Sequence, residues 1–283
     1  MSETEAYYPQ GDLMKGKRGL IMGVANDKSI AWGISKALAA QGAELAFTFQ
    51  GEALEKRVRP LAESVGAELI LPCDVSDDGS IDAVFDRLNK EWDGKLDFVV
   101  HAIAFSDKEE LKGKYLDTSL GNFTKSMHIS CYSFTAVAQR AYPMMKANGG
   151  GSLLTLSYLG AERVMPHYNV MGVAKAALET SVQYLAVDLG GDNIRVNAIS
   201  AGPIKTLAAM GIGDFRYILK WNELNSPLKR NTTIDDVGGT GLYLLSDLGK
   251  GMTGEVLHVD AGYHVVGMKA IDAPDIALEV KKD

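Results

Sequence analysis

The sequence predicts an α/β protein built on one doubly wound parallel sheet of about seven strands with helices on both faces. Three observations support this class. Short apolar runs alternate with longer segments of helical periodicity along the chain. The apolar runs lack the polar alternation of half-exposed strands, as expected of strands buried on both faces. The turns between these segments are short, which suits β-α-β crossovers.

The composition of the chain argues against several classes of partner and location before any motif is considered. The chain has 283 residues, a formal net charge of -7 and 46% hydrophobic residues, which suits one large domain. No basic block is present, so nucleic acid is not expected as a partner. The first residues are polar and acidic, and no apolar run reaches transmembrane length. We therefore expect no signal peptide and no membrane association.

The cysteines indicate the redox compartment, and the histidines bear on metal binding. Cys73 and Cys131 are the only cysteines, and neither belongs to a CxxC motif. We expect both to be free thiols in a reducing cytoplasm. The five histidines show no metal-ligand spacing, so no metal site is expected.

The first predicted strand, residues 18–22, leads into a turn and a helix start. Gly23 opens the turn, and Ser29 is the expected N-cap of a helix that begins at Ile30. Free N–H groups and the helix dipole at such an N-terminus attract phosphate. However, the next glycine is Gly33, so the spacing is not GxGxxG. Taken alone, this turn is better explained as an ordinary strand-to-helix connection than as a dinucleotide loop.

The second predicted strand, residues 44–49, ends at Gln50. In NAD-binding units the corresponding position usually carries an acid that holds the adenosine ribose. Gln50 can hydrogen-bond a ribose hydroxyl and does not repel a 2′-phosphate, and Lys56 and Arg57 follow nearby. The sequence therefore allows NADPH as well as NADH as the cofactor. However, we favour the interpretation that Lys56 and Arg57 lie on a solvated helix face over one in which they bind a 2′-phosphate.

The remaining elements continue the alternation. Expected helices cover residues 52–64, 80–91, 120–145 and 234–246, and expected strands cover 68–71, 96–100, 152–156, 194–200 and 254–260. Residues 207–229 follow a strand end and contain small, apolar and scattered basic residues, which indicates a lid or, equally, an ordinary pair of surface helices. We expect a polar lead-in at 1–14, one domain at 15–268 and a frayed tail at 269–283.

Residues of interest gather where the predicted strands end. In a parallel sheet all strands end at the same edge, and ligands bind there. The residues at or just past these ends are Gly23, Gln50, Asp74, Ile103, Tyr158 and Ile204. Their convergence indicates a ligand site more strongly than any single motif does.

A tyrosine and a lysine provide the candidate chemistry. Tyr168 and Lys175 lie seven residues apart in an expected helix, so the phenol and the ammonium share one face. A nearby cation favours the phenolate, so we expect Tyr168 to stabilise an oxyanion or to release a proton near neutral pH. A second phenol, Tyr158, follows the strand before it. For an isolated pair, the simpler alternative is a packed tyrosine and a solvated lysine.

Several stretches between residues 15 and 268 resemble one family, namely GVANDKSIAWGI, AELAFTFQ, CDV, LSYLGAERVMPHYNVMGVAKAALE and RVNAISAGPIKTLAA. They are similar to the NADH-dependent enoyl-acyl-carrier-protein reductases, a divergent branch of the short-chain dehydrogenase/reductase superfamily with a Rossmann-type fold. The wider superfamily has a TGxxxGxG turn and a tyrosine four residues before its lysine. This sequence instead has Met171 at that position and Tyr168 three residues earlier, which is typical of the enoyl reductases.

The longer spacing suits a conjugate reduction. Hydride goes to C3 of a 2-enoyl thioester, while negative charge develops on the thioester oxygen two carbons away. The hydroxyl that meets this charge must therefore lie farther from the nicotinamide than in a ketone reductase. Moving the tyrosine by three residues shifts its attachment by about 4.5 Å along a helix at ~1.5 Å per residue.

The resemblance implies the NADH-dependent reduction of the C2=C3 bond of trans-2-enoyl-acyl-carrier protein, the last step of fatty acid elongation. It implies cofactor contacts by Gly23, Ser29, Ile30, Gln50, Asp74, Val75, Ile103, Lys175, Ile204, Lys205, Thr206, Leu207 and Ala208. It implies catalysis by Tyr158, Tyr168 and Lys175, and substrate contacts by Ser106, Tyr158 and Tyr168.

Within this set, the resemblance has Lys175 holding the nicotinamide ribose and Tyr168 bonding the thioester oxygen. Tyr158 either donates a proton or shapes the pocket. Ala104 stands where many relatives have glycine, so the pocket wall is expected to be fuller and inhibitor binding stays open.

The resemblance also implies partners. The carrier protein is acidic, so an acidic enzyme needs a local basic patch, for which we propose Arg216, Lys220, Lys229 and Arg230. A homotetramer is expected by analogy with the superfamily. Two alternatives are a superfamily enzyme acting on a carbonyl or alcohol and a silent NAD-binding regulator. The tyrosine spacing disfavours the first, and the presence of Tyr158, Tyr168 and Lys175 together disfavours the second.

Overall fold

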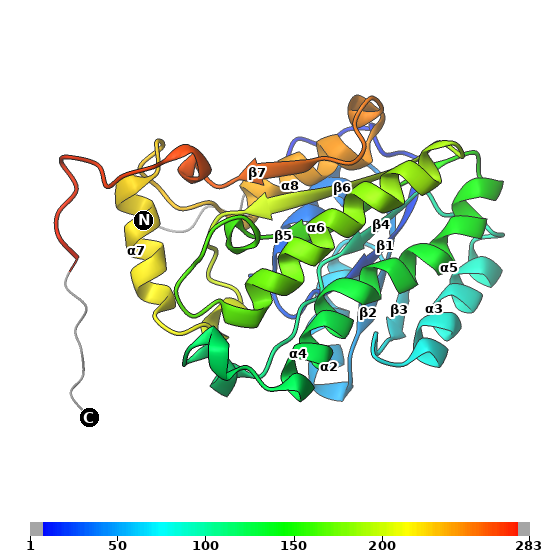
Figure 1. Cartoon of the computed structure of the whole chain (residues 1–283). Coiled ribbons are helices and arrows are strands. Elements are labelled where there is room, and N and C mark those ends of the chain that lie inside the picture. The colour runs from blue at the N-terminus through cyan, green and yellow to red at the C-terminus, as the bar shows by residue number, and fades with distance from the viewer. Residues whose placement is uncertain (1–7, 277–283) are drawn as a thin grey trace.

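The computed structural model describes residues 8–276, and its centre is a seven-stranded sheet in which all neighbouring strands run parallel (Figure 1). The strand order is β3-β2-β1-β4-β5-β6-β7. The strands are β1 (Arg18–Met22), β2 (Glu44–Phe49), β3 (Leu69–Pro72), β4 (Phe98–His101), β5 (Gly151–Ser157), β6 (Ile194–Ala201) and β7 (Val256–Val259). The predicted fold class, a doubly wound α/β sheet, is confirmed.

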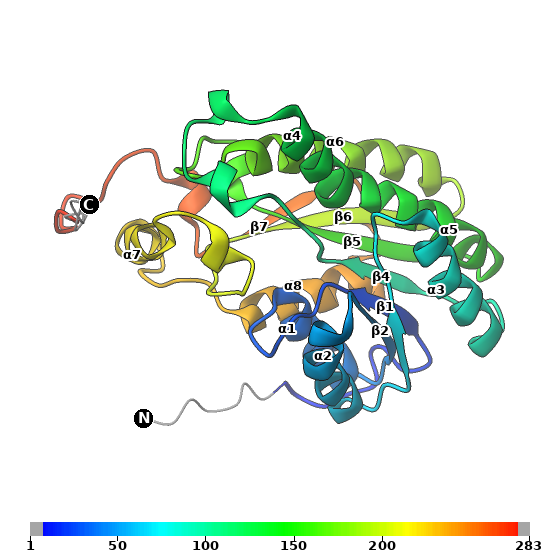
Figure 2. The same cartoon turned by 90° about the horizontal axis from the view of Figure 1, so that it is seen from below.

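Helices cover both faces of the sheet (Figure 2). One face carries α1 (Ile30–Ala40), α2 (Glu52–Ser64) and α8 (Ile234–Leu245), and the other carries α3 (Asp78–Glu91), α4 (Leu120–Met127), α5 (Ser133–Ala147) and α6 (Asn169–Gly190). Helix α7 (Phe215–Asn225) lies beyond the carboxyl ends of the strands. The predicted bounds differ from these by a few residues, the usual uncertainty of element ends.

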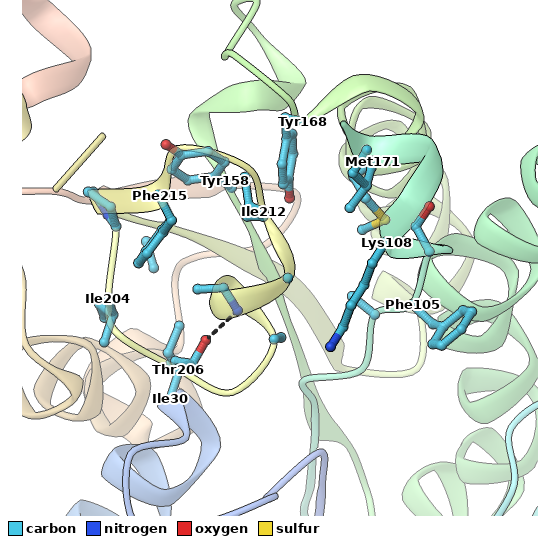
Figure 3. A pocket seen from close by; sticks show the side chains of 18 of the residues that line it. Ile30, Phe105, Lys108, Tyr158, Tyr168, Met171, Ile204, Thr206, Ile212 and Phe215 are labelled. Carbon is cyan, nitrogen blue, oxygen red and sulfur yellow. Dashed lines mark hydrogen bonds between the residues drawn. The ribbon is translucent and has the colours of Figure 1, made fainter. Parts of the chain in front are cut away.

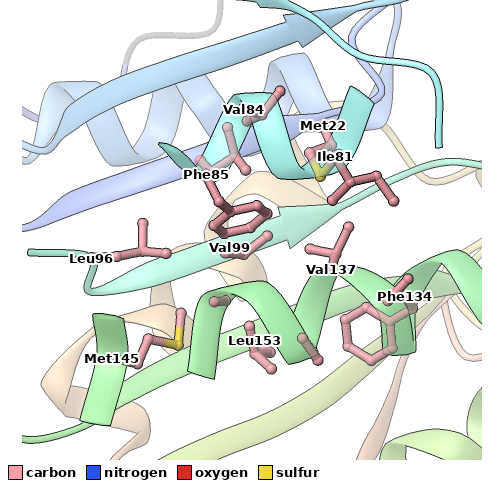
Figure 4. Close-up of a cluster of buried hydrophobic side chains, with 14 of the residues drawn as sticks. Met22, Ile81, Val84, Phe85, Leu96, Val99, Phe134, Val137, Met145 and Leu153 are labelled. Atoms are coloured by element: carbon pink, nitrogen blue, oxygen red, sulfur yellow. The ribbon is translucent and has the colours of Figure 1, made fainter. Parts of the chain in front are cut away.

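Two apolar layers hold the helices to the sheet. Side chains alternate between the faces of a strand, so Leu20 and Met22 of β1 pack in one layer and Ile21 in the other. Figure 4 shows the layer under α3 and α5, where Phe85 and Phe134 approach β4 and β5 from the two helices. This packing fixes the strands whose ends carry the candidate site residues.

The helix expected at residues 120–145 is interrupted. It consists of α4, a π-helical turn at His128–Tyr132, and α5. Within the π turn, the Ser130 hydroxyl accepts a hydrogen bond from Phe105 N at 2.9 Å and donates one to Phe105 O at 3.1 Å. π-helical turns often occur beside functional sites. Here the turn anchors the loop that leaves β4.

Two glycines allow close backbone approaches near the expected site. Gly23, just past β1, has φ +100°, and a Cβ there would lie 2.1 Å from Ala102 O beyond β4. Gly33 lies where α1 crosses α8, and a Cβ there would lie 2.2 Å from Ile234 O. Any larger side chain would push these segments apart.

Helix α8 begins as the sequence predicts. The Thr233 hydroxyl accepts from Asp236 N at 3.1 Å, and the Asp236 carboxylate accepts from Thr233 N at 2.8 Å, which forms a capping box. Residues 277–283 of the tail predicted at 269–283, and residues 1–7 of the polar lead-in, lie outside the described residues. Within residues 8–276, no helix is long and apolar enough to span a membrane.

Candidate active site

The predicted site residues lie along one edge of the sheet. Gly23 follows β1, Gln50 follows β2, Asp74 lies two residues past β3, Ile103 two past β4, Tyr158 follows β5 and Ile204 lies three past β6. The strand order changes direction between β1 and β4. In open α/β sheets, ligands bind outside the carboxyl ends at such a switch point.

The turn between β1 and α1 forms a backbone cradle. The Ser29 hydroxyl accepts from Ala25 N at 2.9 Å and from Asn26 N at 3.1 Å, so Ser29 folds the turn back on itself. Ser29 is the N-cap residue of α1, as predicted, but its side chain makes no capping hydrogen bond, because these earlier amides occupy the hydroxyl. Amides in the first turn of α1 point beyond the helix, where anions bind. Because Gly23 has no side chain, the turn packs directly against Ala102 O.

The ends of β2 and β3 are joined by their side chains. Gln50 Nε2 donates to Asp74 Oδ2 at 2.9 Å. The other Asp74 oxygen accepts from Ser76 N and Oγ, and the bond with the Ser76 hydroxyl is the largest cause that lowers the pKa of Asp74. Asp74 is therefore an ionised acceptor beside Gln50. This pair fits the adenosine end of a dinucleotide.

A cavity of about 770 Å³ opens on the β5 and β6 side of the same edge (Figure 3). Its wall includes seven predicted residues, Ile30, Ser106, Tyr158, Tyr168, Ile204, Thr206 and Ala208. The other predicted residues do not line it, namely Gly23, Ser29, Gln50, Asp74, Val75, Ile103, Lys175, Lys205 and Leu207. Ile30, the first residue of α1 after the backbone cradle, also lines this cavity, so the cradle and the cavity are adjacent.

Tyr168 is held just outside α6. It occupies the N-cap position of that helix, and its neighbours His167 and Asn169 both have left-handed backbones, with φ 57° and 40°. The expectation that Tyr168 lies inside the helix is therefore wrong. Asn169 Nδ2 donates to the carbonyls of Glu110 and Gly113, which fixes this turn against the loop after β4. The strain of two such residues is typical of functional sites.

The two phenols face differently. Their rings meet edge to face, with centroids 5.0 Å apart and planes at 74°. In Figure 3 the Tyr168 hydroxyl points into the cavity, whereas the Tyr158 hydroxyl points away from it. Burial is the main cause that raises the pKa of both phenols above the ordinary value. Both are therefore protonated at neutral pH and can donate hydrogen bonds.

Lys175 lies behind the cavity wall. Its side chain is 6% exposed, and its Nζ donates to Leu156 O on β5 at 2.7 Å. Burial lowers the pKa of Lys175 to about 8, against the raising effects of Cys131 and Glu179. We expected the lysine charge to favour a Tyr168 phenolate. The structure contradicts this, because burial of the phenol dominates its pKa.

The segment predicted as a lid borders the cavity. After Thr206, whose hydroxyl accepts from Ala209 N at 3.1 Å, a short 3-10 turn (Ala209–Gly211) leads to α7. Ile212 and Phe215 from this segment face the cavity in Figure 3. The segment lies opposite the loop after β4, and Gly211 lies against the aliphatic part of Lys108.

Sequence reasoning did not assign several cavity residues. Phe105 and Leu111 lie in a loop without periodicity, and no local pattern identifies them. Met171 was noted only as the residue that replaces the superfamily tyrosine. It lies three positions after Tyr168, so helical spacing was a signal for its place on the same wall. Phe215 is 8% exposed at the start of α7 and closes the lid side.

The expected basic patch is largely neutralised within the chain. Arg230 forms two bonds to the Asp236 carboxylate, at 2.6 and 2.9 Å. Lys220 lies 3.1 Å from Glu223, and Lys229 lies 3.9 Å from Asp272. Separately, no group of three or more His, Cys, Asp and Glu side chains between residues 8 and 276 is placed to hold a metal ion.

Comparison with known proteins gives one consistent family. A family model described as enoyl-(acyl carrier protein) reductase matches residues 23–264. The enoyl-[acyl-carrier-protein] reductase [NADH] 1 of Rhizobium meliloti is 71% identical, over 94% of this chain and 97% of its own. The family model spans β2 to β7 and residues 207–229.

Solved structures agree with this result. An enoyl-acyl-carrier-protein reductase from Anaplasma phagocytophilum, in complex with NAD, is 68% identical with a TM-score of 0.89 and covers 94% of this chain and 100% of its own. The Bacillus cereus enoyl-acyl carrier protein reductase, with NADP+ and an indole naphthyridinone, is 52% identical with a TM-score of 0.88 and covers 91% and 100%. The chain belongs to the enoyl-(acyl carrier protein) reductase family.

Proposed function

We propose that this chain is an NADH-dependent enoyl-acyl-carrier-protein reductase, which reduces the C2=C3 bond of a trans-2-enoyl thioester in fatty acid elongation. The observation that carries this proposal is the Tyr168 hydroxyl, which points into a cavity that Ile30 of the phosphate cradle also lines. The family membership supports the same reaction. Residues 15–268 act as one catalytic domain, with residues 207–229 as its lid.

The cofactor lies along the sheet edge. Gly23, Ser29 and Ile30 hold the pyrophosphate, and the other cofactor contacts follow from the strand ends. Gln50 bonds the adenosine ribose, Asp74 and Val75 the adenine, and Ile103 borders the nicotinamide half, with residues 204–208 closing over it. The Gln50–Asp74 hydrogen bond supports NADH over NADPH, because an ionised carboxylate beside the ribose repels a 2′-phosphate.

Tyr168 acts on the thioester oxygen. When bound, NADH supplies the hydride that reaches C3, and negative charge then develops on that oxygen. The buried Tyr168 phenol is protonated, so it donates a hydrogen bond to this charge and stabilises it in the transition state. Lys175 holds the nicotinamide ribose and adds its positive charge. Ser106 contacts the substrate, and Tyr158 shapes the cavity wall beside Tyr168.

The enzyme works in the cytoplasm. Cys73 and Cys131 are both free and buried, which suits a reducing compartment. Cell fractionation followed by detection of the chain tests this location, and recovery in an oxidising compartment would contradict it.

The reaction and the roles of Tyr168 and Lys175 are tested by NADH oxidation with a 2-enoyl thioester. Tyr168→Phe removes the donor to the oxyanion and should lower kcat by about 10²–10³-fold while NADH binding is retained. Lys175→Ala should weaken NADH binding. Tyr142→Phe, a tyrosine bonded to Asp192 far from the cavity, is the control and should change neither. An unchanged kcat in Tyr168→Phe, or turnover of a 3-oxoacyl thioester only, would contradict the proposal.

Cofactor binding should depend on pH through Lys175. Because burial lowers its pKa to about 8, the ammonium is present below that pH and is lost as pH rises through it. NADH affinity of the free enzyme should therefore weaken above about pH 8, as measured by fluorescence titration. Lys175→Gln should bind NADH more weakly and without this pH dependence. Affinity that stays constant up to about pH 10, the range of an ordinary lysine, would refute the role.

The acyl-carrier protein docks beside the lid. Of the four basic residues considered, Arg216 on α7 is the best candidate, because it forms no ion pair within residues 8–276, whereas Lys220 lies beside Glu223 and Arg230 is bound by Asp236 through two hydrogen bonds. Charge reversal of Arg216 and Lys220 should raise KM for the carrier-bound substrate but not for a coenzyme A thioester. Lys90→Glu, an exposed reversal on α3, is the control. Equal effects on both substrates would rule out this surface.

A homotetramer is the proposed assembly, and exposed apolar side chains on α6 support a contact there. Tyr184 is 72% exposed and Val187 is 82% exposed, although α6 otherwise packs on the sheet. Val187→Asp should dissociate the tetramer into smaller species in sedimentation velocity, since an interface cannot bury an unpaired charge. Ile271→Asp, at an exposed residue in the C-terminal segment, should leave the assembly intact. A monomeric parent chain would contradict the proposal.

A further inference from the structure

A carboxylate beside the candidate site, that of Glu179, has no part in the reaction as proposed. Glu179 lies on α6, four residues after Lys175, so the two side chains are neighbours on one face of the helix. Helix α6 lies over β5 and β6 (Figure 1), and Glu179 is partly buried against these strands. Acidic side chains are seldom buried unless they are paired, so the partners of Glu179 bear on its role.

The end of β5 holds both charged side chains. Lys175 Nζ donates to Leu156 O at 2.7 Å, and the hydroxyl of the next residue, Ser157, donates to the Glu179 carboxylate. Two consecutive residues of β5 therefore anchor two side chains that lie one turn apart on α6. This double anchor keeps the carboxylate beside the ammonium.

The other ionisable groups that face Lys175 are neutral. They are Cys131 of the π turn and His101 at the end of β4. Burial raises the pKa of the Cys131 thiol, and burial lowers the pKa of His101 to about 3. Among the ionisable groups that face Lys175 within residues 8–276, Glu179 is thus the one that can be negative near neutral pH.

A row of polar side chains extends from Glu179 to the edge of the sheet. Ser157, Ser200 and His258 are paired in register across β5, β6 and β7. Their neighbours along each strand pack in the layer with α1 and α8, so these three side chains point to the opposite face, under α6. At the end of the row, His258 Nε2 lies 2.6 Å from Glu162 Oε1. Glu179 therefore lies between Lys175 and a second pair of ionisable groups.

The groups around Glu179 act on its ionisation in both directions. Burial is the largest cause that raises the pKa of Glu179, and Glu162 raises it further. The hydrogen bond from Ser157 is the largest cause that lowers it, and His258 and Lys175 act in the same direction. The Tyr168 phenol also faces Glu179, and it is protonated and neutral. A hydroxyl that donates to a carboxylate forms one of the stronger hydrogen bonds, which favours the ionised form.

We propose that Glu179 is a positioning residue for the reaction, because as the counter-charge of Lys175 it keeps the buried ammonium protonated where it holds the nicotinamide ribose. This inference rests on the proposed role of Lys175. An ammonium with a neutral carbonyl as its partner is disfavoured by burial, and an adjacent carboxylate compensates for that cost. Glu179 acts through Lys175 and does not contact the reacting atoms.

The test is the pH dependence of NADH affinity, measured by fluorescence titration. In the parent chain, affinity should fall above about pH 8, where Lys175 loses its proton. Glu179→Gln keeps the size of the side chain and an acceptor for Ser157 but removes the charge. The midpoint of the fall should then move down by about one pH unit, the lower end of the shift that an opposite charge causes. Glu179→Ala should give the same displacement, which covers the case in which Glu179→Gln does not fold.

Two further variants separate charge from structure. Glu179→Asp retains the carboxylate and should bring the midpoint back toward that of the parent. Asp86→Asn removes the same charge from an exposed position on α3 and should leave the midpoint unchanged. A purely structural role of Glu179 would weaken NADH binding by the same factor at every pH. That result, or an unmoved midpoint in both uncharged variants, would overturn the inference.

Failure of this inference can be told apart from failure of the proposed function. If the parent chain binds no NADH, the proposed function itself fails. If its affinity is constant up to about pH 10, the range of an ordinary lysine, the role of Lys175 is refuted and that of Glu179 with it. If the parent shows the expected fall above about pH 8 and the uncharged variants show the same fall, only the role of Glu179 fails.

Discussion

Parallel pairing of all neighbouring strands is the constraint on which the rest of this structure depends. A parallel strand must be reached by a crossover, so each strand delivers its following loop to the same edge of the sheet. Gly23, Gln50 and Tyr158 are far apart in the sequence but meet at that edge. The close approach at Gly23, where any side chain would collide with Ala102 O, keeps β1 and β4 near enough to form the switch point.

Burial decides the chemistry at this edge. It raises the pKa of Tyr168 and lowers that of Lys175, so each group is shifted toward its neutral form. For the tyrosine, this makes a protonated hydrogen-bond donor rather than a phenolate base. The lysine stays charged at neutral pH, but neutral pH lies only slightly below its lowered pKa. The site is therefore suited to stabilising an oxyanion by hydrogen bonding, in line with conjugate reduction.

The loops around the cavity are held by specific polar contacts rather than by the main apolar layers. Ser130 in the π turn binds both backbone groups of Phe105, and Asn169 binds the carbonyls of Glu110 and Gly113. These contacts place the loop after β4 against the turn that carries Tyr168. Helix α7, in the segment proposed as a lid, contributes Phe215 and Ile218 to two neighbouring cavities, so one helix borders both the candidate site and the space behind Tyr158.

The sequence by itself determined the sheet, its parallel class and the strand ends, because apolar runs and helical periodicity are local signals of burial. It also determined the identity and spacing of Tyr168 and Lys175. Only the tertiary structure decided that Tyr168 lies before α6, that the Ser29 hydroxyl binds amides of the preceding turn rather than amides of α1, and that burial outweighs the lysine charge. The π turn and the cavity behind Tyr158 also arise only there, since desolvation and cavity shape depend on segments that are distant in the chain and meet only in the folded protein.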